Sequence, residues 1–247
     1  MQLNKTSDYS FTIIVPVYNE KDNMDTVEKV LREYLPTAPC SACVLFVDDG
    51  SADGSTELIE KICERNEHMF YISFVHNCGL SAAIKAGIDY SQSQYIGYID
   101  ADLQTSPQDF NLLLPKIKDY ALVNGIRANR KDTKFKRLQS KIANGFRRKM
   151  TGDRATDTGC PLKVLQAGVA KNIPFFKGMH RFLPALVTLQ AGAKYTEMPV
   201  RHFPRMAGKS KFHLSNRLVG PFIDCFAFRW MKSRYINYTV NTNDIGK

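Results

Sequence analysis

Short apolar runs alternate with amphipathic segments through the first half of the chain. The runs are rich in Val, Ile, Phe and Tyr, which is typical of buried strands. Between them, apolar residues recur every three or four positions, and this spacing predicts helices. The predicted strands span 11–17, 44–47, 70–75, 95–99 and 121–126. The predicted helices span 22–34, 55–66 and 81–90, and a further helix begins at Pro107.

This alternation of strands and helices predicts an open α/β fold. A crossover helix between consecutive strands brings them into parallel pairing, with helices covering both faces of the sheet. Beyond Arg127 the pattern changes to a basic helical stretch over 127–149 and then to loop-rich sequence with Gly and Pro. No repeat, low-complexity tract or linker separates the two parts, so we expect one fold with a functional seam at Arg127.

Polar loops follow each of the first four predicted strands. They lie at 16–20, 48–55, 76–79 and 100–104. The carboxyl ends of parallel strands form the edge where open α/β sheets bind ligands, so these loops are expected to meet there. Each loop taken alone also fits a simple turn, and Asp53 alone fits a helix N-cap.

Two of these loops carry paired acids. Asp100 and Asp102 form a D-x-D pair, and Asp48 and Asp49 form a second acidic strand end. Carboxylate oxygens are the ligands that Mg²⁺ and Mn²⁺ prefer, and these ions commonly bridge substrate phosphates. No G-x-G-x-x-G and no G-x-x-x-x-G-K-[ST] motif occurs, so a bound diphosphate would be neutralised by a metal and by basic side chains.

The charge is divided between the two halves of the chain. Residues 1–126 hold 9 Lys/Arg against 18 Asp/Glu, a balance of −9, whereas 127–247 hold 25 against 6, a balance of +19. The acidic half suits cations and the basic half suits anions. The densest basic run, 127–149, fits a solvated helix face, anionic lipid or phosphorylated substrates. No RNA-binding signature accompanies it, so nucleic acid is not an expected partner.

The cysteines and the hydropathy of the chain indicate where in the cell the protein is expected. Six scattered cysteines in a chain with no signal peptide favour free thiols in the cytoplasm. No apolar stretch reaches the ~18–20 residues that span a bilayer, and the nearest, 218–231, is interrupted by charged residues and proline. Residues 215–238 therefore fit either an amphipathic helix on a membrane surface or a helix packed against protein.

The ordered motifs resemble those of the family 2 glycosyltransferases of the GT-A fold. The carrying segments are Val15–Glu20, Val47–Ser55, Asn77–Gly79 and Asp100–Gln104. Gly125–Arg130, Asp157–Cys160 and Val200–Lys211 resemble the polyprenyl-phosphate sugar transferases, the group that includes dolichol-phosphate mannose synthase. The resemblance covers roughly residues 10–215 and implies a Rossmann-like, mostly parallel sheet with a basic region on the acceptor side.

The resemblance also implies a division of the chain. The GT-A domain would span 1–215, with a nucleotide-sugar half over 1–126 and an acceptor half over 127–215. The remaining residues, 216–247, form an amphipathic tail that fits a membrane interface or packing on protein. One departure concerns residues 105–108, Thr-Ser-Pro-Gln, where relatives often carry an acid or a histidine after the glutamine.

The roles that the resemblance implies fall into three groups. The nucleotide sugar would contact Pro16, Tyr18, Glu20, Asp48, Asp49, Asn77, Lys85, Asp100, Ala101 and Asp102. A divalent metal, Mg²⁺ or Mn²⁺, would bind Asp102 and Gln104. The acceptor phosphate and the leaving group would face Arg127, Arg130, Arg201, Lys209, Ser210 and Lys211, with Asp157 orienting the acceptor or acting as a base.

The implied reaction is inverting transfer of one sugar from a GDP- or UDP-sugar to a polyprenyl phosphate at the cytoplasmic membrane face. Two alternatives stay open: a soluble family 2 transferase that uses a hydroxyl acceptor with Asp157 as general base, and a non-enzymatic basic module with a degenerate nucleotide site. Assembly into a homo-oligomer also stays open.

Overall fold

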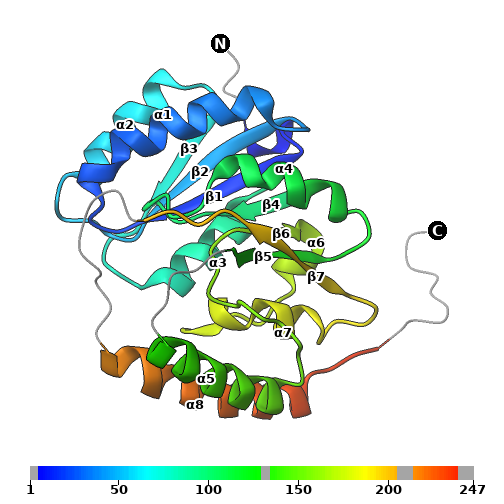
Figure 1. Ribbon diagram of the computed structural model, residues 1–247. Helices are drawn as coiled ribbons and strands as arrows, with labels where there is room; N and C mark the ends of the chain where they lie inside the picture. Colours follow the sequence, from blue (N-terminus) through cyan, green and yellow to red (C-terminus); the bar gives the residue numbers. More distant parts are fainter. Residues whose placement is uncertain (1–4, 129–133, 205–213, 239–247) are drawn as a thin grey trace, which may run out of the picture.

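The computed structural model describes residues 5–128, 134–204 and 214–238 (Figure 1). The strands are β1 Phe11–Val17, β2 Ala42–Asp48, β3 Met69–Ser73, β4 Tyr95–Tyr98, β5 Leu122–Arg127, β6 Lys163–Gln166 and β7 Tyr195–Val200. The helices are α1 Met24–Tyr34, α2 Ser55–Arg65, α3 Leu80–Tyr90, α4 Phe110–Leu113, α5 Lys134–Thr151, α6 Ala167–Lys171, α7 Leu183–Val187 and α8 Leu214–Arg234. Short 3-10 turns include η4 Pro107–Asp109 and η6 Met179–Phe182.

The described strands form one mixed sheet in the order β3-β2-β1-β4-β6-β5-β7. Pairing is parallel for β1 with β2 and β4, for β2 with β3, and for β5 with β7. Only β6 pairs antiparallel among these, with β4 on one side and β5 on the other. The predicted α/β sheet, mostly parallel and flanked by helices, is therefore confirmed.

Two strands were not predicted from the sequence. β6 is only four residues long and carries a fully buried lysine, Lys163, so its pattern does not look like that of a core strand. β7 contains Glu197 and Pro199, and most of its residues are only half-buried. Of the predicted helices, the one at Pro107 begins as the 3-10 turn η4 and continues only as the short α4.

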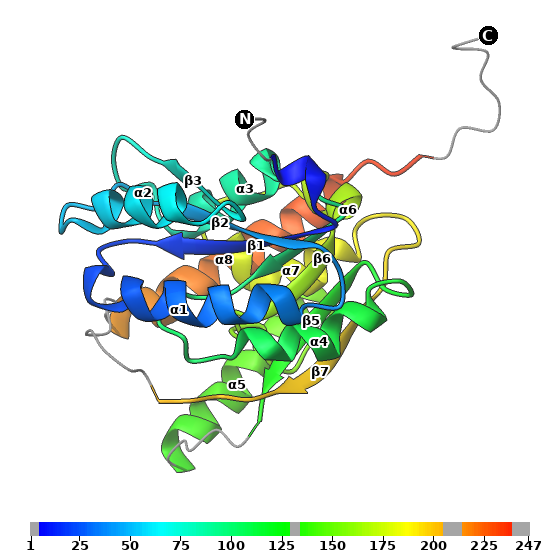
Figure 2. The same cartoon turned by 90° about the horizontal axis from the view of Figure 1, so that it is seen from above.

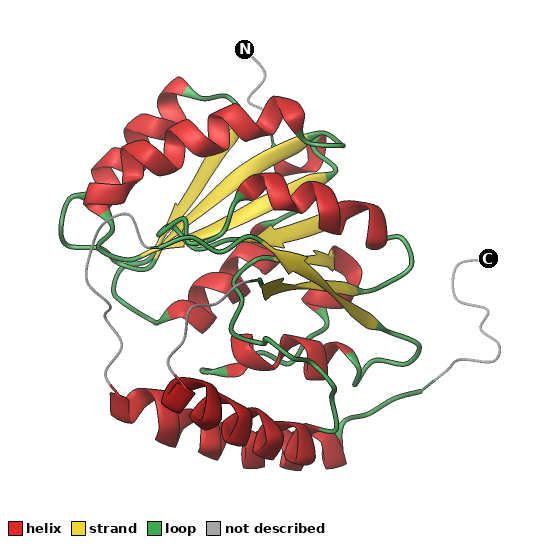
Figure 3. Ribbon diagram, viewed as in Figure 1, coloured by secondary structure: helices red, strands yellow, loops and turns green. Residues whose placement is uncertain are grey.

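Helices cover both faces of the sheet (Figures 2 and 3). One core joins the sheet to α1, α2 and α4, and includes Phe11, Phe46 and Phe110. The other joins the opposite face to α3, α6, α7 and η6. Because β1 and β2 are covered on both faces, almost all of their side chains are buried, which explains their continuous apolar runs.

Helices α5 and α8 lie side by side as an outer layer beyond α7 (Figures 1 and 3). Phe228 of α8 is buried and stacks on Phe182 of η6 with ring centroids 6.0 Å apart. Phe146 of α5 stacks on Phe222 of α8 at 4.9 Å. The expected start of the tail, residue 216, therefore falls inside a helix that packs on the rest of the chain. No described helix combines the length and apolarity needed to cross a bilayer.

Candidate functional site

The loops after β1 and β2 are joined by side chain to backbone hydrogen bonds. The backbone N–H of Asn19 donates to Ser51 Oγ at 2.9 Å, and the N–H of Ala52 donates to Asn19 Oδ1 at 2.8 Å. The N–H of Glu20 donates to Ser55 Oγ at 3.0 Å. These bonds hold the two polar loops together at the carboxyl edge of the sheet.

Asp48 organises the loop after β2 from inside. Its carboxylate is fully buried and accepts hydrogen bonds from Ser51 N–H at 3.1 Å, Thr56 Oγ1 at 2.7 Å and Ser73 Oγ at 2.8 Å. Three donors from three places in the chain satisfy most of the acceptor capacity of one carboxylate. Asp48, which the sequence predicts to contact the nucleotide, therefore also fixes the conformation of the loop after β2.

Asp49 joins the same loop to the loop after β3. Its carboxylate accepts hydrogen bonds from Asn77 Nδ2 at 2.8 Å, from Cys78 N–H at 2.7 Å and from Gly79 N–H at 2.9 Å. Gly79 is the N-cap of α3, so the carboxylate also lies near the positive end of that helix. Burial nevertheless raises the pKa of Asp49 above its usual value.

Gly50 lets these loops approach closely. It has φ +69°, and a Cβ atom there would lie 2.5 Å from the backbone carbonyl carbon of His76. Only glycine adopts this conformation readily and leaves room for a neighbouring backbone. The glycine that follows Asp48 and Asp49 is therefore explained by its positive φ and by the close approach of the His76 backbone.

The D-x-D pair follows β4, as predicted. Tyr98 donates its hydroxyl hydrogen to Asp100 Oδ1 at 2.5 Å, and the N–H of Gln104 donates to Asp102 Oδ1 at 3.2 Å. Burial, and after it the negative charge of Asp102, raises the pKa of Asp100 to about 6. A cation bound beside the pair would relieve that repulsion.

The donor set fits a divalent metal that is shared with a substrate. Asp100, Asp102 and Gln104 offer oxygen ligands of the kind that Mg²⁺ and Mn²⁺ prefer. No group of three or more His, Cys, Asp or Glu side chains close enough to hold a metal occurs within 5–128, 134–204 and 214–238. Mg²⁺ typically takes one or two carboxylates and completes its shell with substrate phosphates and water, so a pair is sufficient.

Arg127 and Asp157 form a bidentate ion pair at the end of β5. Arg127 Nε donates to Asp157 Oδ2 at 2.8 Å and Nη2 donates to Oδ1 at 2.7 Å. Both side chains are largely buried. Burial alone would raise the pKa of Asp157, but the hydrogen bonds and charge of Arg127 lower it below its usual value.

Arg201 binds a different acid. Its Nε donates to Asp109 Oδ1 at 2.8 Å, and its backbone N–H donates to Asp109 Oδ2 at 2.7 Å. The carbonyl of Gln104 accepts from the N–H of Phe203 at 2.8 Å and from His202 Nδ1 at 3.0 Å. These bonds attach the segment after β7 to the segment that follows the D-x-D pair.

A cavity of about 290 Å³ opens beside Asp100. Its wall also includes Lys163 and Arg181, which belong to none of the sequence motifs. Lys163 is directly opposite Tyr98 in the β4–β6 register and donates to the carbonyls of Thr158 and Cys160. Only strand pairing brings Lys163 to Asp100, so no local sequence signal marks it.

His180 belongs to the same cavity. It forms a hydrogen bond with Ser81 Oγ at 2.7 Å, and the N–H of Gly178 donates to the same hydroxyl at 2.9 Å. Burial, then the charges of Arg181 and Lys163, lower the pKa of His180 to about 3. The ring is therefore neutral near neutral pH.

The other predicted site residues have varied surroundings. Lys85 pairs with Asp89 one turn further along α3. Tyr18 is exposed beside the first loop, and Ala101 is buried between the two acids of the pair. Pro16 is half-buried in β1, and Glu20 accepts a hydrogen bond from Asn23. Arg130, Lys209, Ser210 and Lys211 lie outside the described residues.

Comparison with known families and proteins identifies related sequences. The family model described as "Glycosyl transferase family 2" matches residues 12–176. The dodecaprenyl-phosphate galacturonate synthase of Rhizobium johnstonii is 30% identical over 230 residues, covering 90% of this chain and 68% of the relative. The undecaprenyl-phosphate 4-deoxy-4-formamido-L-arabinose transferase of Salmonella paratyphi A is 33% identical over 220 residues, covering 86% and 65%. The chain thus spans about two thirds of the length of these relatives.

Solved structures share the fold. Glucosyl-3-phosphoglycerate synthase from Mycobacterium tuberculosis aligns with a TM-score of 0.65 at 12% identity, covering 98% of this chain and 86% of the other. A mannosyltransferase from Pyrobaculum calidifontis, in complex with GDP-Man and Mn²⁺, aligns with a TM-score of 0.63 at 14% identity, covering 94% and 66%. The GT-A fold expected from the motifs is therefore confirmed.

Proposed function

The chain belongs to glycosyl transferase family 2, and from this premise we propose that it transfers one sugar from a nucleotide diphosphate sugar to a polyprenyl phosphate. The names of both curated relatives specify a polyprenyl phosphate, which supports this acceptor class.

The observation that carries the proposal is the position of the D-x-D pair. The pair follows β4, which lies parallel to β1, so it is next to the interlocked loops of β1, β2 and β3. Asp100 also lines the cavity to which Lys163 and Arg181 belong. The acidic side suits a metal with the donor's diphosphate, and the basic side suits an anionic acceptor. The −9 and +19 halves of the sequence thus meet at one place.

The reaction needs little proton transfer. A phosphate monoester is already anionic near neutral pH, so one of its oxygens attacks the anomeric carbon while the bond from that carbon to the diphosphate oxygen breaks. The electron pair leaves with the nucleoside diphosphate, and in-line attack inverts the anomeric centre. A bound Mg²⁺ or Mn²⁺ would neutralise charge on the diphosphate, while Asp102 and Gln104 hold the ion.

The surroundings of Asp157 favour a phosphate acceptor over a hydroxyl acceptor. A hydroxyl would need a general base, and Asp157 is the candidate that the sequence offers. Both of its oxygens accept hydrogen bonds from Arg127, and its pKa is below the usual value. An efficient base has a pKa near the working pH, so this carboxylate is poorly suited to the task. We assign it instead to holding Arg127.

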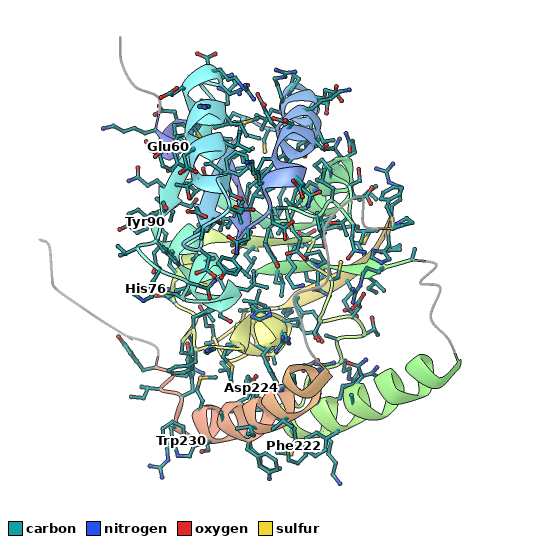
Figure 4. All side chains as sticks on the ribbon, turned by 90° about the vertical axis from the view of Figure 1, so that its left-hand side faces the viewer. Glu60, His76, Tyr90, Phe222, Asp224 and Trp230 are labelled. Atoms are coloured by element: carbon teal, nitrogen blue, oxygen red, sulfur yellow. The ribbon has the colours of Figure 1, made fainter. Side chains whose placement is uncertain are left out.

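We also propose that the outer face of α8 binds the cytoplasmic surface of a membrane. Its exposed apolar residues recur at helical spacing, at Val219, Phe222, Ile223, Phe226 and Trp230. Phe222 and Trp230 point away from the domain, whereas Asp224, the one acid of α8, points toward it (Figure 4). Exposed cations occur in the same two helices, Arg148 and Lys149 in α5 and Arg229 and Arg234 in α8. An exposed apolar helical face with basic side chains nearby suits an anionic bilayer.

The direct test is transfer itself. The protein is incubated with a panel of GDP- and UDP-sugars, a short polyprenyl phosphate and Mg²⁺ or Mn²⁺, and lipid-linked sugar is measured. We expect product with one donor and none in the presence of a chelator. Absence of product with every donor would contradict the proposal, and transfer to a polyprenol but not to its phosphate would favour the hydroxyl alternative.

A further inference from the structure

The cavity beside Asp100 connects the sheet edge to the outer helical layer. Its wall includes Asp100 and Lys163 from the sheet, Arg181 from η6 and Pro221 from α8. Pro221 is followed directly by the exposed residues Phe222 and Ile223. A molecule in this cavity would therefore contact the D-x-D segment and, at the same time, reach the helix with the apolar outer face.

The ionisable side chains around the cavity are mainly basic. Lys163 and Arg181 line it, and the positive charges of both lower the pKa of His180. Among the described residues of its wall, Asp100 is the one acid. Two further acids are near. Asp157 is paired with Arg127, and Asp224 of α8 faces η6, where Arg181 partly offsets the effect of burial on its pKa. Asp157 thus already has a basic partner, and Asp224 is influenced by the positive charge of Arg181.

Lys163 and Arg181 differ in what they can offer a ligand. The Lys163 ammonium is fully buried and donates to the carbonyls of Thr158 and Cys160, so its part is to fix that loop and add positive charge. Arg181 is only half-buried and carries a planar guanidinium. A guanidinium presents several N–H donors in a geometry that matches two phosphate oxygens.

We propose that this cavity receives the phosphate group of the lipid acceptor and that Arg181 is its principal ligand. The inference rests on the proposed function and assigns a site for its acceptor to residues that the motifs do not include. Arg181 would hold the attacking phosphate beside the sugar, which the D-x-D pair positions. The prenyl chain would leave past Pro221 along the apolar face of α8, which is also the face we assign to the membrane.

The test compares Arg181→Gln and Arg181→Lys with the wild type. Loss of a charge-assisted hydrogen bond predicts that Arg181→Gln raises the KM for a short polyprenyl phosphate about 10- to 100-fold. Arg181→Lys keeps the charge without the bidentate geometry, so its KM for the acceptor should lie between those of the wild type and Arg181→Gln. Binding of the nucleotide sugar with Mn²⁺, measured by thermal shift, should stay at the wild-type level in both variants.

Two matched controls separate a phosphate ligand from a structural arginine. Arg154→Gln removes a positive charge at an exposed position and should leave both substrates unaffected. Asp224→Asn removes the α8 carboxylate whose pKa the charge of Arg181 lowers, but leaves Arg181 in place. If the effect of Arg181→Gln came only from losing its electrostatic interaction with Asp224, Asp224→Asn would raise the acceptor KM equally, and that result would overturn the inference.

Other outcomes are equally decisive. If Arg181→Gln weakened binding of the nucleotide sugar and left the KM for the acceptor unchanged, the cavity would hold the donor sugar, contrary to the proposal. Binding of the short polyprenyl phosphate is also measured by calorimetry without any donor. If the polyprenyl phosphate binds in a way that requires Arg181 but no sugar is transferred, the proposed reaction is refuted and the cavity assignment stands. If sugar is transferred but acceptor binding does not require Arg181, the cavity assignment is refuted and the proposed reaction stands.

Discussion

The guanidinium of Arg127 contacts both carboxylate oxygens of Asp157, at 2.8 and 2.7 Å, across a separation of thirty residues in the sequence. This pair joins the end of β5 to the loop that leads into β6. The same loop supplies the carbonyls that Lys163 binds. The ion pair therefore fixes one wall of the cavity beside Asp100.

Asp157→Asn should destabilise the protein and leave transfer to a phosphate acceptor measurable. Removing one partner of a largely buried pair leaves Arg127 uncompensated, which costs about 3 kcal/mol in the free energy of unfolding. Urea unfolding measures the change, with Asp119→Asn at an exposed position as the matched control. Complete loss of transfer in a variant that is still folded would instead indicate a general base.

The pairing of Asp157 with Arg127 also predicts acid sensitivity. Because the folded state lowers the pKa of Asp157, the resulting stabilisation is present above the unfolded-state pKa of about 3.9. It is lost as the pH falls through the lower folded-state pKa. The free energy of unfolding should therefore fall less steeply below pH 4 in Asp157→Asn than in the wild type, and equal slopes would contradict this.

The lowered pKa of His180 predicts a second pH dependence of the free energy of unfolding, at less acidic pH. Its folded-state pKa is about 3, whereas an unfolded histidine has a pKa of about 6.5. Between these values the unfolded state binds the extra proton, so stability falls as the pH falls. At pH 5 the loss is about 2 kcal/mol. His180→Gln should remove this part of the pH dependence, whereas His76→Gln at an exposed position should retain it.

Asp102→Ala should abolish metal-dependent nucleotide binding. Ligand at about 100 times its Kd stabilises the native state by about 2.7 kcal/mol, so the correct donor with Mn²⁺ should raise the Tm of the wild type. The variant should show no such rise, and Asp25→Asn, which removes an exposed carboxylate, should behave like the wild type. A Tm rise of equal size in Asp102→Ala would place the metal elsewhere.

The outer face of α8 predicts binding to vesicles that contain anionic lipid. Replacing both Ile223 and Trp230 with serine removes large apolar groups from the proposed contact, so partition onto the vesicles should weaken at least about tenfold. Tyr90→Ser changes an exposed aromatic residue on another side of the molecule and serves as control (Figure 4). Equal co-sedimentation of all three proteins would refute the assignment.

Local sequence predicted the first half of the fold well. β1 agrees at both ends with the predicted strand, and α1, α2 and α3 lie within one or two residues of the predicted helices. β1 carries a continuous apolar run because both of its faces are buried, and each of the three helices carries an apolar stripe because one of its faces packs on the sheet. The hydrophobic pattern that predicts a strand is weaker in β6 and β7. β6 is short with a buried lysine, and β7 mixes acid and proline, so neither has a strand-like pattern.

The site was predictable where its chemistry is local and not where it depends on strand pairing. Asp49, Asp100 and Asp102 follow predicted strands, and the structure brings their loops to one edge of the sheet. The partner of Arg201, Asp109, lies 92 residues away, and Tyr98 meets Lys163 only through the β4–β6 register. Contacts of this kind leave no trace in residue spacing, so the cavity could not have been assembled from motifs.

The position of β6 has a consequence for the order in which the chain folds. β5 is made before β6, yet in the sheet of described strands β6 lies between β4 and β5 and is the strand that joins them. During synthesis β4 would have an open edge and β5 no partner until at least residue 166 has left the ribosome. Unpaired strand edges are templates for pairing with other chains, so these two edges are exposed to wrong pairing until β6 is in place.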